Sequence, residues 1–188
     1  MTGTDAEPRL AAAELIKEAE QSMGKATDVL VHTDGSCLSN PGGPGGFAAV
    51  LIYGKHRREI SGGFQSTTNQ RAEILAALAA LEALKWPCVV TVQTDSRYLA
   101  NGARWSKGWR KRGWTKRNGQ PVKNADLWKR LAALCGRHRV RFTWVKGHNA
   151  GNVENERCDL LAKKAARGCD LPADVGYEQA RALQPISD

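Results

Sequence analysis

A helix that runs directly into a short apolar strand is the feature that most limits how this chain can fold. Apolar residues recur at helical spacing from about 69 to 85, including Ile74 and Leu78, and Pro87 ends the pattern. Residues 89–94 then have the β-branched composition of a short buried strand. Because a helix followed at once by a strand favours a parallel connection, the sequence predicts an α/β fold.

Further strands and helices are expected on both sides of this unit. Three strands should precede it and form an antiparallel meander, at 29–33, 47–53 and 59–64. The segments expected after it are an irregular to helical stretch at 96–118, a helix at 124–136, a strand at 140–145 and a helix at 154–167. The predicted architecture is therefore a five-stranded mixed sheet flanked by helices.

The chain of 188 residues is long enough for one domain with additional segments at its ends. Residues 1–25 read as an N-terminal extension with an amphipathic helix, whose apolar stripe either packs on the main domain or meets a partner protein. Residues 26–168 form the main domain. Residues 169–188 are expected to be a C-terminal tail, because they contain few residues that could build a core.

The net charge of +9 is concentrated in one part of the chain. Fourteen Lys and Arg residues but only one acid, Asp126, lie between residues 101 and 148. Such a block indicates a surface that binds nucleic acid better than it indicates a merely solvated face. No apolar run reaches membrane-spanning length, and the five cysteines form no C-x-x-C pair, so we expect a cytoplasmic protein without a membrane segment.

Four carboxylates stand at the ends of predicted elements, and each has an ordinary explanation by itself. Asp34 precedes a glycine and could belong to a turn, and Glu73 could favour the positive end of a helix dipole. Asp95 could cap a helix, and Asp159 could be a surface residue.

Taken together, these carboxylates predict a metal site. Asp34 and Asp95 follow predicted strands, and ligands of α/β sheets bind at that edge. Glu73 and Asp159 lie near helix starts that could pack across the same edge. Four carboxylates so close would repel one another, and two Mg²⁺ ions, or Mn²⁺ as a substitute, would neutralise them. Such ions, about 4 Å apart, suit displacement at phosphorus.

The longest motifs of the chain resemble bacterial ribonuclease HI, the type 1 ribonuclease H family. The resemblance covers about residues 28–167 and neither end segment; it lies in DGSCLSNPGGPGG, TTNQRAE, TDSRYL, PVKNADLW and VKGHNAGNVENERCDLLA. It implies a ribonuclease H-like fold and a catalytic domain over residues 26–168. It also implies hydrolysis of the RNA strand of RNA–DNA hybrids, giving 5′-phosphate and 3′-hydroxyl ends.

The resemblance also implies roles for the acidic residues and one histidine. Asp34 would bridge both ions, and Asp159 would complete the ion that activates water. Glu73 and Asp95 would complete the ion that faces the leaving oxygen. His148 matches a mobile histidine thought to help proton transfer or product release, although a lone histidine in a Gly/Asn loop is often merely exposed.

Recognition of the hybrid requires a sensor of 2′-hydroxyl groups. By resemblance, this function falls to the loop after the first strand and to the start of the first helix, with Glu73 taking part. For Asn69 and Gln70, ordinary helix-start chemistry is the alternative. The residues implied to read 2′-hydroxyls are Cys37, Asn40, Asn69 and Gln70, and those implied to hold a phosphate of the DNA strand are Thr68 and Arg71.

A basic protrusion that grips the DNA strand is implied for the segment from about 105 to 117. Trp109 is expected to stack on a sugar, and Trp105 is expected to anchor the protrusion to the core. The basic residues implied to contact the hybrid are Arg110, Lys111, Arg112 and Lys123. Phosphate contacts of this kind give salt-dependent affinity without sequence preference.

Two alternatives remain open beside a hybrid-specific nuclease that acts as a monomer. One is a module that binds hybrids or double-stranded RNA without cutting, which requires a missing or displaced carboxylate. The other is a transposase or junction resolvase with the same sheet, which the basic protrusion and the TTNQRAE motif fit poorly.

Overall fold

A computed structural model describes residues 28–147 and 152–183 of the chain. The expected N-terminal helix and His148 lie outside these residues. The strands are β1 (Asp28–Cys37), β2 (Gly45–Tyr53), β3 (His56–Phe64), β4 (Val89–Thr94) and β5 (Arg139–Trp144). The helices are α2 (Asn69–Glu82), α3 (Arg97–Lys111), α4 (Ala125–Arg137), α5 (Val153–Ala166) and α6 (Val175–Ala182).

The five strands form one mixed sheet in the order β3-β2-β1-β4-β5. β1, β2 and β3 pair antiparallel, which confirms the predicted meander. β4 pairs parallel to β1, and β5 pairs parallel to β4. The helical crossover between β3 and β4 produces the expected parallel pairing, because it returns the chain to the end of the sheet at which β1 begins.

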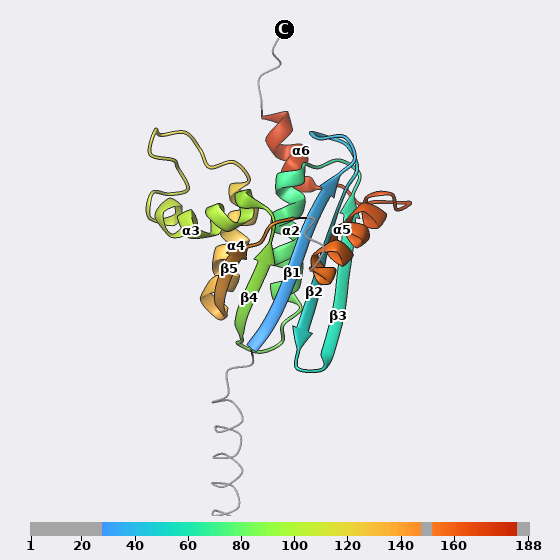
Figure 1. Ribbon diagram of the computed structural model, residues 1–188. Helices are drawn as coiled ribbons and strands as arrows, with labels where there is room; N and C mark the ends of the chain where they lie inside the picture. Colours follow the sequence, from blue (N-terminus) through green and yellow to red (C-terminus); the bar gives the residue numbers. More distant parts are fainter. Residues whose placement is uncertain (1–27, 148–151, 184–188) are drawn as a thin grey trace, which may run out of the picture.

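Helices cover both faces of the sheet (Figure 1). α2 packs on β1 and β2 and also contacts α3 and α4, whereas α5 packs on β1, β2 and β3 from the other face. α2 is apolar on most sides because it is enclosed between the sheet and α4. No helix in the described part of the chain is long and apolar enough to cross a bilayer.

The two tryptophans of α3 differ in burial from what was predicted for the anchoring residue. Trp109 packs against the core, with its ring centroid 5.6 Å from that of Trp128 on α4. Trp105 is 57% exposed and contacts Trp109 at a centroid distance of 6.0 Å. The prediction that Trp105 anchors the protrusion is therefore wrong, because α4 approaches α3 on the side of Trp109.

The segment after α5 is more than a tail. It contains α6, and Asp174, which caps this helix, is only 4% exposed. The Asp174 carboxylate accepts hydrogen bonds from Thr67 Oγ1 at 2.7 Å and from Arg71 Nε and Nη2 at 2.7 and 2.8 Å. This polar contact holds α6 against the start of α2 without apolar packing, which explains why its sequence lacks a core pattern.

Candidate active site

The pairing of β1 with β4 places two carboxylates next to each other. Thr33 is the register partner of Thr94, so the following residues, Asp34 and Asp95, lie side by side where the parallel pairing of β1 with β4 ends. β1 itself continues to Cys37 through its pairing with β2, so Asp34 lies within the strand and does not follow it as expected from the sequence. Asp95 is not the helix cap considered from the sequence. The cap of α3 is Ser96, whose hydroxyl accepts a hydrogen bond from the Leu99 amide.

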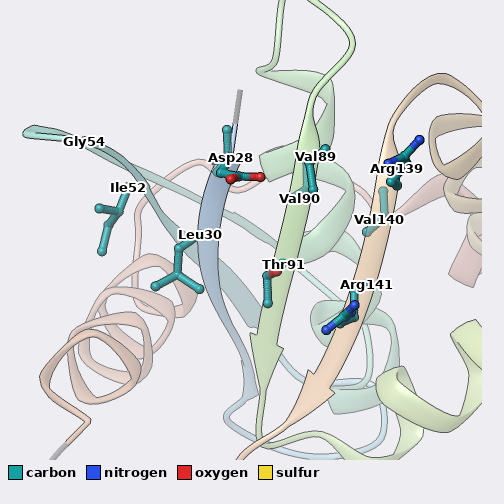
Figure 2. A pocket seen from close by; sticks show the side chains of 11 residues that line it. Asp28, Leu30, Ile52, Gly54, Val89, Val90, Thr91, Arg139, Val140 and Arg141 are labelled. Carbon is teal, nitrogen blue, oxygen red and sulfur yellow. The ribbon is translucent and has the colours of Figure 1, made fainter. Parts of the chain in front are cut away.

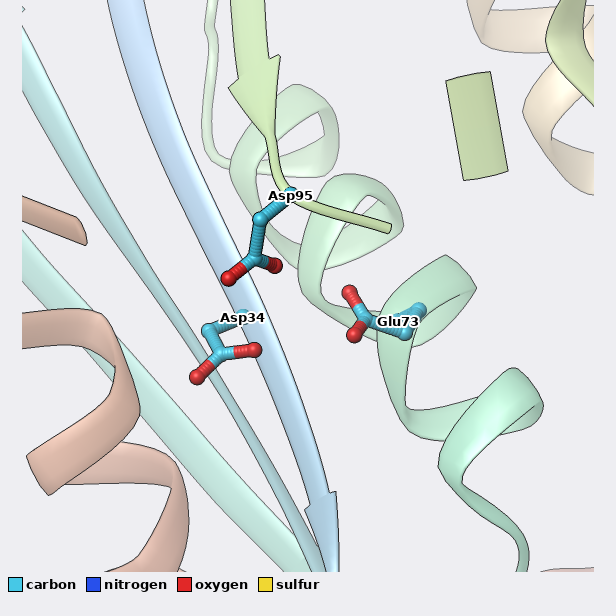
Figure 3. Close-up of side chains that lie close together, drawn as sticks. All are labelled: Asp34, Glu73 and Asp95. Carbon is cyan, nitrogen blue, oxygen red and sulfur yellow. The ribbon is translucent and has the colours of Figure 1, made fainter. Parts of the chain in front are cut away.

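A close approach between β1 and α2 brings in the third carboxylate. A Cβ atom at Gly35 would overlap the backbone nitrogen of Glu73 and the side chain of Ala72, so this position requires glycine. Gly35 therefore lets the helix lie against the strand and does not form the turn considered from the sequence. One carboxylate oxygen each of Asp34, Glu73 and Asp95 lie within 4.8 Å of one another (Figure 3).

The charges of this group are poorly compensated by the protein. Burial raises the pKa of Asp34 to about 7, and repulsion from Asp95 and Asp159 adds to the shift. Burial, followed by repulsion from Asp34 and Asp95, also raises the pKa of Glu73. Glu73 Oε2 is sealed from solvent and has no hydrogen-bond partner among the described residues. A buried oxygen without a donor, beside two further carboxylates, is the ligand set of a hard divalent cation.

Asp159 borders this group without joining it. Its carboxylate lies close enough to Asp34 to raise the pKa of that residue. However, Asp159 Oδ2 accepts a 2.8 Å hydrogen bond from Lys163, one helical turn further along α5. The structure thus brings three of the four predicted carboxylates together and places the fourth beside them, paired with an ammonium group.

Asn155 is a site residue that the sequence did not reveal. It is 4% exposed on the inner side of α5, and its Nδ2 donates a 3.2 Å hydrogen bond to Asp95 Oδ2. Gly147 abuts the same carboxylate, and a Cβ atom there would contact Asp95 Oδ2. Asp95 is therefore oriented from two sides. Asn155 is visible in the sequence as the asparagine of the motif ENERCD, but asparagine near a helix start usually indicates only capping.

The loop after β1 and the start of α2 lie against each other, as hybrid recognition would require. The Asn40 side-chain oxygen accepts a hydrogen bond from the Asn69 amide. Cys37 Sγ lies 3.3 to 3.6 Å from three backbone carbonyl oxygens of this region. Thr68 caps α2 by accepting from the Arg71 amide. Asn69 and Gln70 are exposed on the first turn.

Arg71 does not have the donors that a phosphate contact needs. It is 2% exposed, and it pairs with Asp126 and Asp174 at 2.7 Å each. Its Nε, Nη1 and Nη2 atoms all donate to these two carboxylates. The sequence resemblance placed Arg71 correctly at the start of α2 but suggested the wrong partner, because the two acids come from α4 and from the segment before α6.

The basic protrusion is present and open to solvent. It consists of the last turn of α3 and the turns that lead to α4 (Figure 1). The predicted contact residues in this region are all exposed, namely Arg110, Lys111, Arg112 and Lys123.

A separate hollow of about 640 Å³ lies at the other end of the sheet. Asp28, Val89 and Arg139, the first residues of β1, β4 and β5, line it together with Arg141 (Figure 2). None of the candidate site residues that the structure describes lines this hollow. The described side chains that could take part in catalysis therefore lie at the opposite end of the sheet from this hollow.

Comparison with known proteins agrees with this arrangement. The family model described as RNase H matches residues 26–167. The chain is 55% identical to ribonuclease H of Aeromonas salmonicida (strain A449) over 149 residues, which cover 79% of this chain and 96% of that one. It is 54% identical to ribonuclease H of Syntrophus aciditrophicus (strain SB) over 151 residues, 79% of this chain and 86% of that one.

A solved structure shares the fold as well. The crystal structure of LC9-RNase H1, described as a type 1 RNase H with the type 2 active-site motif, superposes with a TM-score of 0.68. The match has 32% sequence identity and covers 84% of this chain and 82% of that chain. The fold and the acidic edge define a nuclease of the ribonuclease H-like class. The chain belongs to the RNase H family and is an endoribonuclease.

Proposed function

We propose that this chain hydrolyses the RNA strand of RNA–DNA hybrids with two divalent cations, Mg²⁺ or Mn²⁺, and leaves 5′-phosphate and 3′-hydroxyl ends. The observation that carries the proposal is the group of Asp34, Glu73 and Asp95, whose ligand oxygens lie within 4.8 Å of one another and which includes a buried Glu73 oxygen that no described residue donates to. Cations bound there would supply an activated water and stabilise the leaving oxygen.

Each residue of the site has a defined task in this proposal. Asp34 is central, because Asp95 and Asp159 both act on its carboxylate, and it is the residue to bridge two ions. Glu73 and Asp95 would hold the ion on the leaving-group side, and Asn155 orients Asp95 through its amide. Asp159 would have to exchange Lys163 for a cation before it could complete the second ion.

The hybrid would be held on both sides of the carboxylates. Asn69, Gln70 and exposed residues of the β1–β2 loop would read 2′-hydroxyl groups, which their exposure and the Asn69–Asn40 hydrogen bond between these two segments support. The exposed cations Arg110, Lys111 and Arg112 would contact the DNA strand. Thr68 and Arg71 were the two residues expected to hold a phosphate of the DNA strand. Since Arg71 is paired with Asp126 and Asp174, Thr68 is the remaining candidate.

The test compares three labelled substrates, a hybrid, an RNA duplex and a DNA duplex, each with and without Mg²⁺. Only the RNA strand of the hybrid should be cut, and only with the metal. The Asp95→Asn variant should bind the hybrid and fail to cut it. Tight binding by the wild type without any turnover in Mg²⁺ or Mn²⁺ would instead identify a binding module.

We also propose a cellular compartment, an oligomeric state and a partner contact for this enzyme. All five cysteines are free in the structure, which supports a reducing compartment such as the cytoplasm. A monomer bound to its hybrid substrate is the proposed working form, and sedimentation of the full chain would test it. Contact with a partner protein through residues 1–25 or the C-terminal segment is a further proposal.

A further inference from the structure

The outer side of α5 has a groove that begins at the candidate active site. The opposite side of the helix is buried against the sheet through Cys158, Ala162 and Ala166. The groove has a volume of about 610 Å³ and is bounded at one end by Asp159. Its other lining residues are Leu160, Lys163, Lys164, Arg167, Gly168 and Cys169.

The lining of this groove is strongly basic. Asp159 is its only acid, and Lys163 already neutralises that carboxylate at 2.8 Å. Lys164 and Arg167 are exposed and form no ion pair or side-chain hydrogen bond with any residue that the structure describes. Two positive charges are thus available in a hollow that is bounded by a carboxylate of the proposed metal site.

A simpler reading is that these cations only favour the negative end of the α5 dipole. The dipole accounts for positive charge in the last turn of α5. It does not account for the hollow that connects these charges to Asp159. It also does not account for the side chain of Leu160, which lines the same hollow and is 55% exposed. A bound chain of phosphates and sugars would use all three features.

The groove and the basic protrusion lie on opposite faces of the sheet. α3, which carries the protrusion, contacts β4 and β5, whereas α5 contacts β1, β2 and β3 (Figure 1). The carboxylates lie between them, where the pairing of β1 with β4 ends. A hybrid whose DNA strand lies on the protrusion therefore leaves its RNA strand to pass the α5 side.

We propose that the α5 groove binds phosphates of the RNA strand next to the one that is cut, through Lys164 and Arg167. This proposal depends on the proposed function, because the cut phosphate must lie at the carboxylates. At about 1.5 Å rise per residue, Arg167 lies about 12 Å along α5 from Asp159. A stretch of this length spans more than one phosphate of a bound strand.

The experiment uses the full chain and a hybrid whose cleavage position has been mapped. The Lys164→Glu/Arg167→Glu variant is compared with Lys55→Glu/Arg58→Glu, which makes the same charge change at exposed positions by the β2–β3 turn, at the other end of the sheet. The groove variant should raise KM about tenfold, leave kcat within about twofold and lower the salt slope of binding by about two. The control variant should change KM, kcat and the salt slope only by the small amount expected from the lower net charge of the whole protein.

A second arm needs no protein variant. Single RNA phosphates of the hybrid are replaced by neutral methylphosphonates, one position at a time on both sides of the cut. Wild-type affinity should fall at about two or three consecutive positions on one side only, and the groove variant should lose that sensitivity.

Two results overturn the proposal, and they are distinguishable. The groove is not an RNA site if the wild type cuts normally but the groove and control variants behave alike. The same conclusion follows if no neutral phosphate in the RNA strand weakens binding. If the wild type does not cut the hybrid at all, the proposed function fails first, and the groove assignment fails with it.

Discussion

Removal of the Asp174 carboxylate tests whether the C-terminal segment belongs to the folded domain. In the wild type, this carboxylate accepts hydrogen bonds from Thr67 Oγ1, from two nitrogens of Arg71 and from the Tyr177 amide. The Asp174→Ala variant leaves a guanidinium that is 2% exposed with one of its two acidic partners. Thr67 and the first turn of α6 lose their acceptor at the same time.

The expected loss can be worked from this geometry. Removing one member of a buried ion pair costs about 3–5 kcal/mol, and the remaining Asp126 places Asp174→Ala near the lower end, at about 3 kcal/mol. For a chain of this size, the melting temperature should fall by about 6–12 °C. The Asp126 side chain is 44% exposed, so the matched Asp126→Ala variant should lose only about 1 kcal/mol.

Urea unfolding followed by circular dichroism measures both variants against the wild type. The linear extrapolation gives the free energy of unfolding in water, and unchanged m values would show that the same surface unfolds. A loss below about 1 kcal/mol for Asp174→Ala, or a loss equal to that of Asp126→Ala, would refute the reasoning. In that case α6 would be an accessory that the domain does not need.

Three further outcomes are expected. Because the pKa of Asp34 is raised from 3.8 to about 7, this carboxyl binds more protons in the folded metal-free protein than in the unfolded chain between these values, whereas His32 and His138, whose pKa values are lowered by burial, act in the opposite direction. Relative to an Asp34→Asn variant, the melting temperature of the metal-free wild type should therefore fall as pH rises through this window, and Mg²⁺ should raise it more at about pH 8 than at about pH 5; the same pH dependence in both proteins would contradict the assignment. Trp109→Ala should cost about 3 kcal/mol in urea unfolding and Trp105→Ala less than about 0.5 kcal/mol, whereas equal losses would return the anchoring role to both. Asn155→Ala should raise the Mg²⁺ concentration for half-maximal cleavage about tenfold, and an unchanged metal titration would show that its hydrogen bond to Asp95 does not matter.

The parts of the fold set by local patterns could be predicted from the sequence. The strands and α2 were found because β-branched runs and a helical apolar stripe are short-range signals. The parallel pairing of β1 and β4 followed from the order of these elements, and it put Asp34 beside Asp95. The Gly35 contact that admits Glu73 could not be predicted, because an Asp-Gly pair indicates a turn more often than a close approach.

The parts that depend on distant polar contacts could not be predicted. Arg71 and Asp174 are 103 positions apart and meet through ion pairs, which leave no periodic trace in the sequence. Likewise, Trp105 and Trp109 are one helical turn apart on α3, and only the position of Trp128 on α4 decides which of them is buried. Asn155 reaches Asp95 only because α5 crosses the sheet beside β1.

The position where β1 begins has a practical consequence. Asp28 lines the hollow at the end of the sheet remote from the carboxylates (Figure 2), and six residues of extended chain separate it from Asp34 by about 20 Å. Cargo joined directly to Asp28, such as a second nucleic-acid-binding module or a surface linker, is therefore attached on the side away from the catalytic carboxylates. Such a tether can concentrate substrate near the enzyme without covering the catalytic groups, so fusions or immobilisation at this end should preserve turnover.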